Sequence, residues 1–411
     1  MVRSHYGQIV ATLTRILGPQ HLDLVEDVVQ DAMVQAARLW SYQGVPERPV
    51  AWLVQVARNK ALDAVRQQAL LRSKAPEIDA WAGRHRAASE EPSIEAIRDD
   101  TLRMMFVACH PSLAEESRVA LTLKAVGGFG TGEIARAFLT TEPTVAQRIV
   151  RAKAKLRDLG LEFELPVGAE FDARLASVLR VLYLVFSEGY APRAGDEPIR
   201  HDLVREAIRL TRELTESAET ARPEVHALLA LMHLLGARIP SRISPVGELV
   251  TLEHQDRSRW NQEWLALGAT HFAASMQGEH ITRYHVEAAI ASVHAMAPSP
   301  EATDWPLILR YYDQLRLVHP SPIVELNRAV AFAMVHGPDQ GLALVESLGL
   351  DARLQGYFPW AITRAELMRR LGHPETAGAF GEALALATNP ADRKFVEAKM
   401  ESLGPSLPDP L

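Results

Sequence analysis

The segment from Pro143 to Arg157 combines basic and amide side chains with apolar residues at helical spacing. Val145, Ile149 and Val150 give a predicted helix a buried side, and no acidic residue interrupts its other side. That polar side carries Gln147, Arg148, Arg151, Lys153, Lys155 and Arg157. In a DNA major groove, arginine and glutamine pair with guanine and adenine edges, while lysine mostly meets phosphate. The segment is therefore a candidate for groove recognition.

A second helix must hold this segment across a groove. Ile134, Ala135 and Phe138 place apolar groups on one face of a short helix that follows Gly132. A turn comes next, and Pro143 suits the first turn of the following helix, where its missing N–H costs nothing. Two helices joined in this way are typical of the helix-turn-helix, whose second helix enters the major groove. A solvated basic face on an ordinary helical hairpin remains the alternative.

The composition bounds the class of protein. The chain has 411 residues, enough for two or three domains, and 47% of them are hydrophobic, which suffices for buried cores. No apolar run approaches the roughly 20 residues that span a bilayer, and the first residues lack the apolar stretch of a signal peptide. Cys109 is the only cysteine, which excludes internal disulfides and cysteine-rich zinc sites. We expect a soluble, cytoplasmic protein without membrane contact.

Charge is unevenly distributed along the chain. Residues 1–160 hold 21 lysines and arginines against 18 acidic residues, whereas the remainder holds 23 against 33. An acidic surface repels nucleic acid, and local basic patches attract it. Contact with nucleic acid is therefore expected in the first 160 residues, and the acidic remainder is expected to have another task.

Helical spacing runs through the whole chain, so the predicted fold class is all-α. Two strong helices are expected at Val25–Trp40 and Trp52–Lys74, separated by a loop rich in glycine and proline. Changes in composition divide the chain into a first helical part, an acidic linker, the helix-turn-helix, a hinge and a long helical remainder. Their bounds are 1–74, 75–100, 101–160, 161–171 and 172–411.

Two segments of the remainder resemble each other, at 326–348 and 364–386. Each reads as a helix, a short turn and a second helix. Gly337 and Gly372 mark the turns and lie 35 positions apart, close to the roughly 34-residue period of tetratricopeptide repeats. The last third of the chain is therefore predicted to stack helical hairpins.

The helix Trp52–Lys74 is a second candidate for contact with nucleic acid. It carries five basic residues against Asp63 alone, and the loop before it offers room for an unstacked base. Capture of a flipped or single-stranded base needs polar groups for its edge and cations for its backbone. Arg58, Asn59, Asp63 and Arg66 supply such groups. An amphipathic surface helix is the plainer interpretation.

Three runs in one order give the chain a family resemblance. They are similar to regions 2 and 4 of bacterial extracytoplasmic-function (ECF) sigma factors. The first two runs are VEDVVQDAMVQAARLW and RPVAWLVQVARNKALDAVRQQ, and the third is GGFGTGEIARAF with its continuation VAQRIVRAKAKLR. The remainder resembles a subgroup with a C-terminal tetratricopeptide-like (TPR) extension, through stretches such as LEHQDRSRWNQEW and SPIVELNRAVAFA. The resemblance implies a region 2 helical bundle, a region 4 helix-turn-helix domain and a helical-hairpin extension.

The resemblance also implies partners and roles for individual residues. Core RNA polymerase, through its β′ clamp helices and β flap, and promoter DNA are the expected partners. The clamp helices are expected to meet region 2 at Asp27, Gln30, Asp31 and Arg38. The melted −10 element is expected at the loop 41–49 with Arg58, Asn59, Asp63 and Arg66. The −35 duplex is expected at Thr144, Gln147, Arg148, Arg151, Lys153 and Lys155.

With only a linker between regions 2 and 4, the resemblance implies two loosely tethered domains that the polymerase holds apart. The extension is expected to regulate activity, with intramolecular contact to the sigma regions as one route. The alternative function is a stand-alone helix-turn-helix regulator whose repeats sense a ligand or a partner. No nucleotide-binding loop, nucleophile elbow or metal-ligand set is present, so we expect neither an enzyme nor a cofactor or metal.

The densest polar cluster of the remainder has two interpretations. It consists of Glu253, His254, Asp256, Arg257, Arg259 and Trp260. Its residue types suit a pocket for a small molecule or partner, and they also suit a salt-bridge knot between helices.

Overall fold

The computed structural model describes residues 2–71, 94–138, 140–192, 197–244 and 249–403. Most of the acidic linker therefore lies outside the described residues, as does the end of the helix expected to reach Lys74. The predicted all-α class is confirmed, because helices account for the described secondary structure apart from an isolated bridge between Ile243 and Leu249. Among these same residues, no helix is long and apolar enough to cross a membrane.

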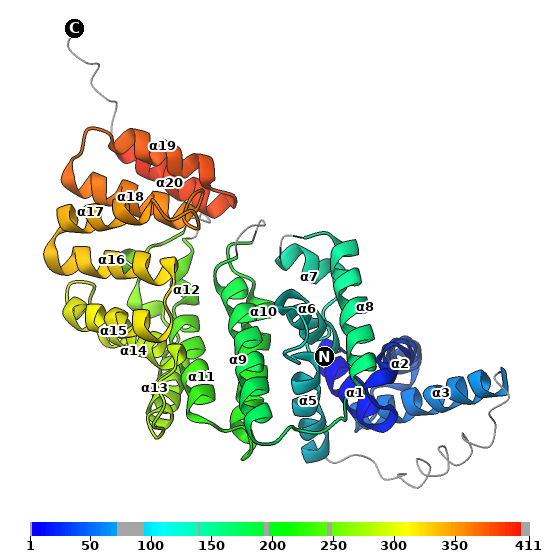
Figure 1. Cartoon of the computed structure of the whole chain (residues 1–411). Helices are drawn as coiled ribbons and strands as arrows, with labels where there is room; N and C mark the ends of the chain where they lie inside the picture. Colours follow the sequence, from blue (N-terminus) through cyan, green and yellow to red (C-terminus); the bar gives the residue numbers. More distant parts are fainter. Residues whose placement is uncertain (1, 72–93, 139, 193–196, 245–248, 404–411) are drawn as a thin grey trace. The chain divides into compact units, whose positions relative to one another are not determined.

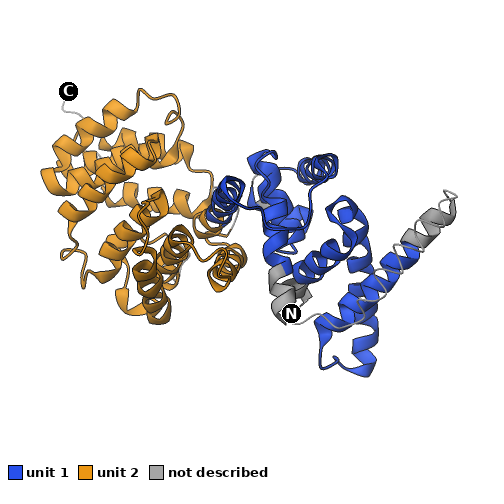
Figure 2. Ribbon diagram, turned by 60° about the horizontal axis from the view of Figure 1, so that its bottom comes forward, with its two compact units in different colours: residues 1–185 blue, residues 186–411 orange. Residues whose placement is uncertain are grey.

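The chain divides into two compact units, residues 1–185 and 186–411 (Figure 2). The N-terminal unit begins with the elements of the expected region 2, which are α1 (Val2–Leu17), η1 (Pro19–His21), α2 (Leu22–Gln43) and α3 (Pro49–Leu71). The expected region 4 follows as α5 (Ile94–Ala108), α6 (Glu115–Ala125), α7 (Thr131–Ala137) and α8 (Glu142–Leu159) (Figure 1).

The ends of α8 follow from local chemistry. Thr141 precedes the helix, and its hydroxyl accepts a hydrogen bond from the N–H of Thr144 at 3.3 Å, which satisfies one of the free donors of the first turn. Pro143 lies in that first turn, as expected. Gly160 ends the helix in the left-handed conformation at φ 59°, which glycine adopts without steric cost.

Regions 2 and 4 pack against each other through α1, which contacts α2, α3, α5 and α6. A Cβ atom on Gly7 would fall 1.8 Å from the backbone oxygen of Val126 in region 4, so glycine permits the close approach of the two backbones. Nearby, Arg15 of α1 forms an ion pair at 2.9 Å with the buried Asp100 of α5. In this structure the two regions are therefore packed on a shared core, and the loose tether that was expected does not describe this form.

The N-terminal unit also includes the first part of α9 (Ala169–Tyr190). The Phe171 ring stacks on Phe106 with centroids 5.4 Å apart, and the Ser177 hydroxyl donates to the backbone oxygen of Cys109 at 2.6 Å. The division between the units falls inside this helix, later than the hinge expected at residues 161–171.

The C-terminal unit is a series of helices. They are α10 (His201–Glu216), α11 (Pro223–Gly236), α12 (Ile239–Arg242), η2 (Leu252–His254), η3 (Arg257–Arg259), α13 (Gln262–Ser275), α14 (Arg283–Met296), α15 (Trp305–Val318), α16 (Pro322–His336), α17 (Pro338–Leu348), α18 (Phe358–Leu371), α19 (Thr376–Leu386) and α20 (Pro390–Ser402). The two expected hairpins are present as α16–α17 and α18–α19. Phe380 and Val345 are fully buried in the core that joins them.

Candidate nucleic-acid interface

The exposed side of α8 is a stripe of polar residues. Gln147, Arg151 and Lys155 follow one another at intervals of four residues, so they lie on one face, and all three are exposed. Thr144 and Arg148 flank the stripe and are half-buried. Gln147, Arg148 and Arg151 make no hydrogen bond or ion pair with other described residues. This stripe has its donors available for a ligand.

The opposite side of α8 anchors the helix in region 4. Val145, Ile149, Ala152 and Leu156 are buried along it. Val150, which was expected on the same side, is 64% exposed. Successive residues of a helix are about 100° apart, so Val150 turns away from the core that Ile149 enters. The prediction of a buried Val150 was wrong for this reason.

A third side of α8 contacts region 2 through Lys153. Its ammonium lies 2.8 Å from Asp23 and 3.1 Å from Glu26, both of α2. Burial alone would lower the pKa of Lys153, but the two carboxylates outweigh it and raise the pKa. Only 10% of this side chain is exposed. The structure therefore separates Lys153 from the stripe of Gln147, Arg151 and Lys155, with which the sequence had grouped it.

Region 2 presents its own polar stripe on α2. Asp27, Gln30, Asp31 and Arg38 are all exposed, and their spacing places them on one face of the helix. Val34 lies on the same face and is exposed, although the sequence did not single it out. Asp31 is 3.5 Å from Lys60 of α3, an exposed pair. Asp23 continues this face toward Lys153, so region 4 adjoins one end of the stripe.

The last turn of α2 and the loop that joins it to α3 carry exposed apolar and aromatic groups. The Tyr42 side chain is 91% exposed, and Val45 nearby is also exposed. The rings of Trp40 in α2 and Trp52 in α3 contact each other, with centroids 5.5 Å apart, and so hold the two helices together on either side of the loop. Exposed aromatic rings beside a basic helix suit the stacking of bases. The loop was expected to begin at Ser41, but α2 extends to Gln43 and includes Tyr42, which sequence reasoning did not single out.

The four residues expected at the −10 element are not equivalent in the structure. Asn59 and Asp63 are exposed on α3. Arg58 is 8% exposed, because α3 turns it toward the interior of the bundle, so its guanidinium is not on the surface that was expected to hold it. The side chain of Arg66 lies outside the described residues.

Comparison with known protein families places regions 2 and 4 within the N-terminal unit. Residues 1–70 match sigma-70 region 2 and residues 103–156 match sigma-70 region 4. Residues 174–276 match a family of unknown function, DUF6596. No solved structure gives a significant match to the chain.

Three relatives extend this result. An uncharacterised protein of Rhizobium meliloti is 38% identical over 93% of this chain and 91% of its own length. The ECF RNA polymerase sigma factor SigE of Mycolicibacterium smegmatis is 31% identical over 38% of the chain and 59% of its own length. The RNA polymerase sigma factor CarQ of Myxococcus xanthus is 30% identical over 35% of the chain and 79% of its own length.

The chain belongs to the ECF sigma factors. As a sigma factor it binds core RNA polymerase and directs it to promoters to start transcription. A stand-alone helix-turn-helix regulator is not favoured, because region 2 is present beside region 4. Sigma factors are not themselves enzymes.

The C-terminal unit of this sigma factor separates the polar cluster around residue 253 into two groups. The Arg257 guanidinium lies over the buried Trp260 ring at 4.6 Å and donates to the backbone oxygens of His294 and Ala297. Glu253 instead pairs with Arg370 of α18 at 3.2 Å, and His254 lies 3.6 Å from Glu253. Asp256 accepts from the N–H of Ser258, and Arg259 is exposed. The residues that the structure describes contain no histidine, cysteine and carboxylate group suited to a metal ion.

Proposed function

We propose that the polar stripe of α8 reads the −35 duplex of the promoter. The observation that carries this assignment is the exposed row of Gln147, Arg151 and Lys155, whose side chains make no hydrogen bond or ion pair with other described residues. Gln147 and Arg151 suit base edges, and Lys155 and Thr144 suit the phosphates beside them. Arg148 lies at the margin of the row, and its guanidinium is assigned to the place where the base edges meet the phosphate backbone.

Region 2 is assigned to the polymerase and to the −10 element. The exposed stripe of Asp27, Gln30, Asp31 and Arg38 is the surface for the β′ clamp helices. The segment 41–49, which comprises the end of α2 and the loop after it, receives bases of the melted strand, with Tyr42 as a stacking platform and with Asn59 and Asp63 as partners for base edges. Unstacking costs a few kcal/mol per base step, and the captured strand offsets it through stacking and pocket contacts.

Regions 2 and 4 must separate for both elements to be bound together. The −10 and −35 elements are about 25 base pairs apart, or about 85 Å at 3.4 Å per base pair. A compact body of about 185 residues has a radius of gyration of only about 16 Å. The contacts of Gly7 with Val126 and of Lys153 with Asp23 therefore belong to a closed form, which opens on the polymerase.

The C-terminal unit is assigned to regulation in the cytoplasm, as a TPR-like extension that contacts the sigma regions or the polymerase. Support comes from its hairpins α16–α17 and α18–α19 and from the acidic surplus after residue 160. Removal of this unit after residue 192 is a better test than removal in the hinge, because Phe171 and Ser177 pack on region 4. Higher transcription from the shortened protein indicates inhibition, and lost transcription indicates a required contact.

Binding of core polymerase tests the assignment of α2. The double variant Asp27→Arg/Asp31→Arg is expected to weaken retention on immobilised core polymerase at least about tenfold, because charge reversal removes the attraction of the interface and like charges placed together there cost several kcal/mol. Arg151→Ala serves as the control and should be retained like the unaltered protein. Equal retention of the unaltered protein and both variants would mean that α2 is not part of the interface with core polymerase.

A further inference from the structure

The C-terminal unit contains a cleft of about 300 Å³ that the function of a sigma factor does not explain. It lies among α16, α18, α20 and the η2 turn, and its apolar wall includes Met334, Phe358, Ile362 and Phe395. Clefts of this size with apolar walls and a few polar groups are typical of small-molecule sites. The polar groups at the edge of the cleft therefore determine which class of ligand it binds.

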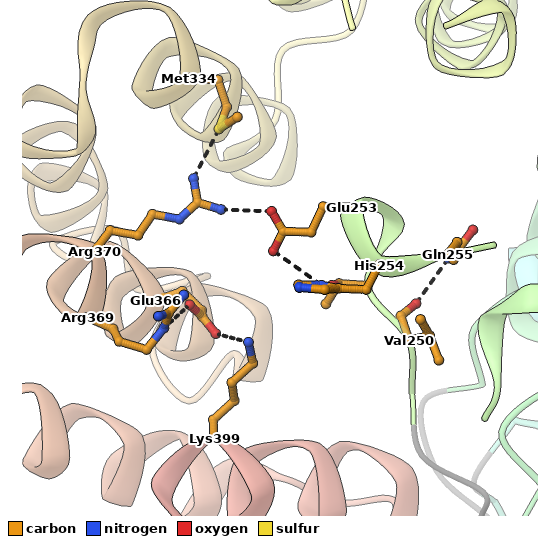
Figure 3. A network of polar contacts seen from close by, with 10 residues as sticks. Val250, Glu253, His254, Gln255, Met334, Glu366, Arg369, Arg370 and Lys399 are labelled. Atoms are coloured by element: carbon orange, nitrogen blue, oxygen red, sulfur yellow. Dashed lines mark hydrogen bonds and ion pairs between the residues drawn. The ribbon is translucent and has the colours of Figure 1, made fainter. Parts of the chain in front are cut away.

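One carboxylate at the cleft is already paired with two cations of its own unit. Glu366 of α18 receives Arg369 at 2.8 Å and Lys399 of α20 at 3.1 Å (Figure 3). Burial alone would raise the pKa of Glu366, but the hydrogen bonds from these two cations outweigh it and lower the pKa. Glu366 is thus held ionised and is engaged by its own cations.

Arg370 differs from Glu366, because the hydrogen bonds that it makes with its partners are weak. One nitrogen donates to a single oxygen of Glu253 at 3.2 Å, and another donates to the Met334 sulfur at 3.1 Å. Guanidinium groups bind carboxylates best through two parallel bonds, and a thioether is a weak acceptor. Figure 3 shows Arg370 facing both Glu253 and Met334. The guanidinium therefore has unused capacity for a carboxylate.

The Glu253 carboxylate comes from a short turn, and both it and Arg370 are partly exposed, at 44% and 35%. An exposed ion pair contributes little free energy. Replacement of Glu253 by another carboxylate would therefore cost little, and an apolar group attached to that carboxylate would gain contact with the Phe358 and Ile362 side of the cleft.

We propose that this cleft binds a small monocarboxylic acid with an apolar body, whose carboxylate replaces Glu253 at Arg370. The apolar body lies along Phe358, Ile362 and Phe395. The ligand frees Glu253, so the η2 turn loses its tie to α18. Binding thereby couples occupation of the cleft to the turn that leads to Trp260.

Titration calorimetry with octanoate on the full-length protein tests this site. Octanoate is expected to bind, hexanoate about tenfold more weakly because two methylenes are lost, and octan-1-ol and octylamine at least about tenfold more weakly because they lack the carboxylate. Equal binding of octanoate and octan-1-ol, or no binding of octanoate, overturns the assignment.

Two substitutions that break the same ion pair have opposite expected effects. Arg370→Gln should weaken octanoate binding at least about tenfold, and Arg370→Lys should lie between it and the unaltered protein, because lysine keeps the charge without the fork. Glu253→Gln should tighten octanoate binding several-fold, because it removes the competing carboxylate. A purely structural pair predicts a loss with both Arg370→Gln and Glu253→Gln, and that result contradicts the proposal. Thermal unfolding of each variant verifies that the unit is folded.

Discussion

Several arginines of the C-terminal unit are held by acidic neighbours, whereas Arg148 and Arg151 on α8 of the N-terminal unit are not. Arg209 lies 2.7 Å from Glu206 and 2.5 Å from Glu213, all on α10. Arg328 of α16 lies 2.7 Å from Asp313 of α15 and joins two helices. Arg148 and Arg151 of α8 make no such pair with other described residues.

The difference explains how one acidic chain can still bind DNA. An arginine whose charge is matched by a carboxylate within the fold gains little from a phosphate, because it must first give up its partner. An unmatched arginine displaces counterions from DNA and gains affinity directly. Local pairing therefore says more about the DNA-binding surface than the net charge of −7 does.

The largest effect is expected when the unmatched stripe is removed. Gln147→Ala/Arg151→Ala should lower the affinity of the polymerase complex for its promoter about 100-fold, because each good pairing with a base contributes about 1–3 kcal/mol. Fluorescence anisotropy with labelled promoter duplex at fixed salt measures this change.

Arg157→Ala is the matched control for that variant. Arg157 lies on the same helix but faces Asp23 at 3.9 Å, so promoter affinity should stay within about twofold. Similar losses from both variants would mean that α8 attracts phosphate without reading bases.

Removal of a matched arginine should act on stability instead. Arg209→Met leaves Glu206 and Glu213, which are mostly buried, facing each other without a cation. We expect the free energy of unfolding of the C-terminal unit to fall by about 2 kcal/mol, with promoter affinity unchanged. Urea unfolding followed by circular dichroism measures the first quantity. A loss of promoter affinity at unchanged stability would place Arg209 at the DNA and break the comparison.

The C-terminal unit should also lose stability in acid. Burial lowers the pKa of His233 to about 4, and the nearby His271 acts in the same direction. The unfolded chain then binds a proton more readily than the folded unit, so stability is complete above about pH 6.5 and falls as the pH drops toward 4. The expected loss between pH 7 and pH 5 is about 1–2 kcal/mol.

The variant His233→Gln should reduce that pH dependence, as unfolding at both pH values would reveal. Promoter binding by α8 should be unaffected, since residues 142–159 contain no histidine. An unchanged pH dependence in His233→Gln would assign the effect to another group.

The smallest effect is expected at Lys153, the one cation of α8 that is firmly paired. Lys153→Met keeps the aliphatic stem but loses the ion pairs with Asp23 and Glu26, which should raise the population of the open form about threefold to fivefold. Faster hydrogen exchange at the beginning of α2 reports this change.

Lys155→Met gives the contrasting result from the other side of the helix. It should leave hydrogen exchange in α2 unchanged and reduce the salt dependence of promoter binding by about one counterion. Hydrogen exchange in α2 that becomes faster with Lys155→Met, or that stays unchanged with Lys153→Met, would mean that the contact with Asp23 does not keep the unit closed.

Much of the fold could be predicted from the sequence, because periodicity and local chemistry define the helices. The strong period from Val25 to Trp40 identified α2, and Pro143 marked the first turn of α8. The hairpins of the last third followed from Gly337 and Gly372. The polar stripe of α8 was also predicted, because intervals of four residues place Gln147, Arg151 and Lys155 on one face.

The remaining features depend on contacts between distant segments, which periodicity does not contain. Gly7 gives no indication that Val126 will approach it, and Asp23 lies 130 positions from Lys153. Arg58 was predicted at the surface because it is charged, yet the turn of α3 places it in the bundle. Stricter use of the helical angle would have separated Lys153 and Val150 from the groups to which they were assigned.

Transcription reconstituted from purified core polymerase tests the central claim most directly, with fragmented DNA of the organism that encodes this protein as template and sequencing of the products. The account predicts discrete start sites only when the protein is added, and their loss with Arg151→Ala while that variant still binds core polymerase. Identical start sites without the protein, or loss of polymerase binding by a folded Arg151→Ala variant, would contradict it.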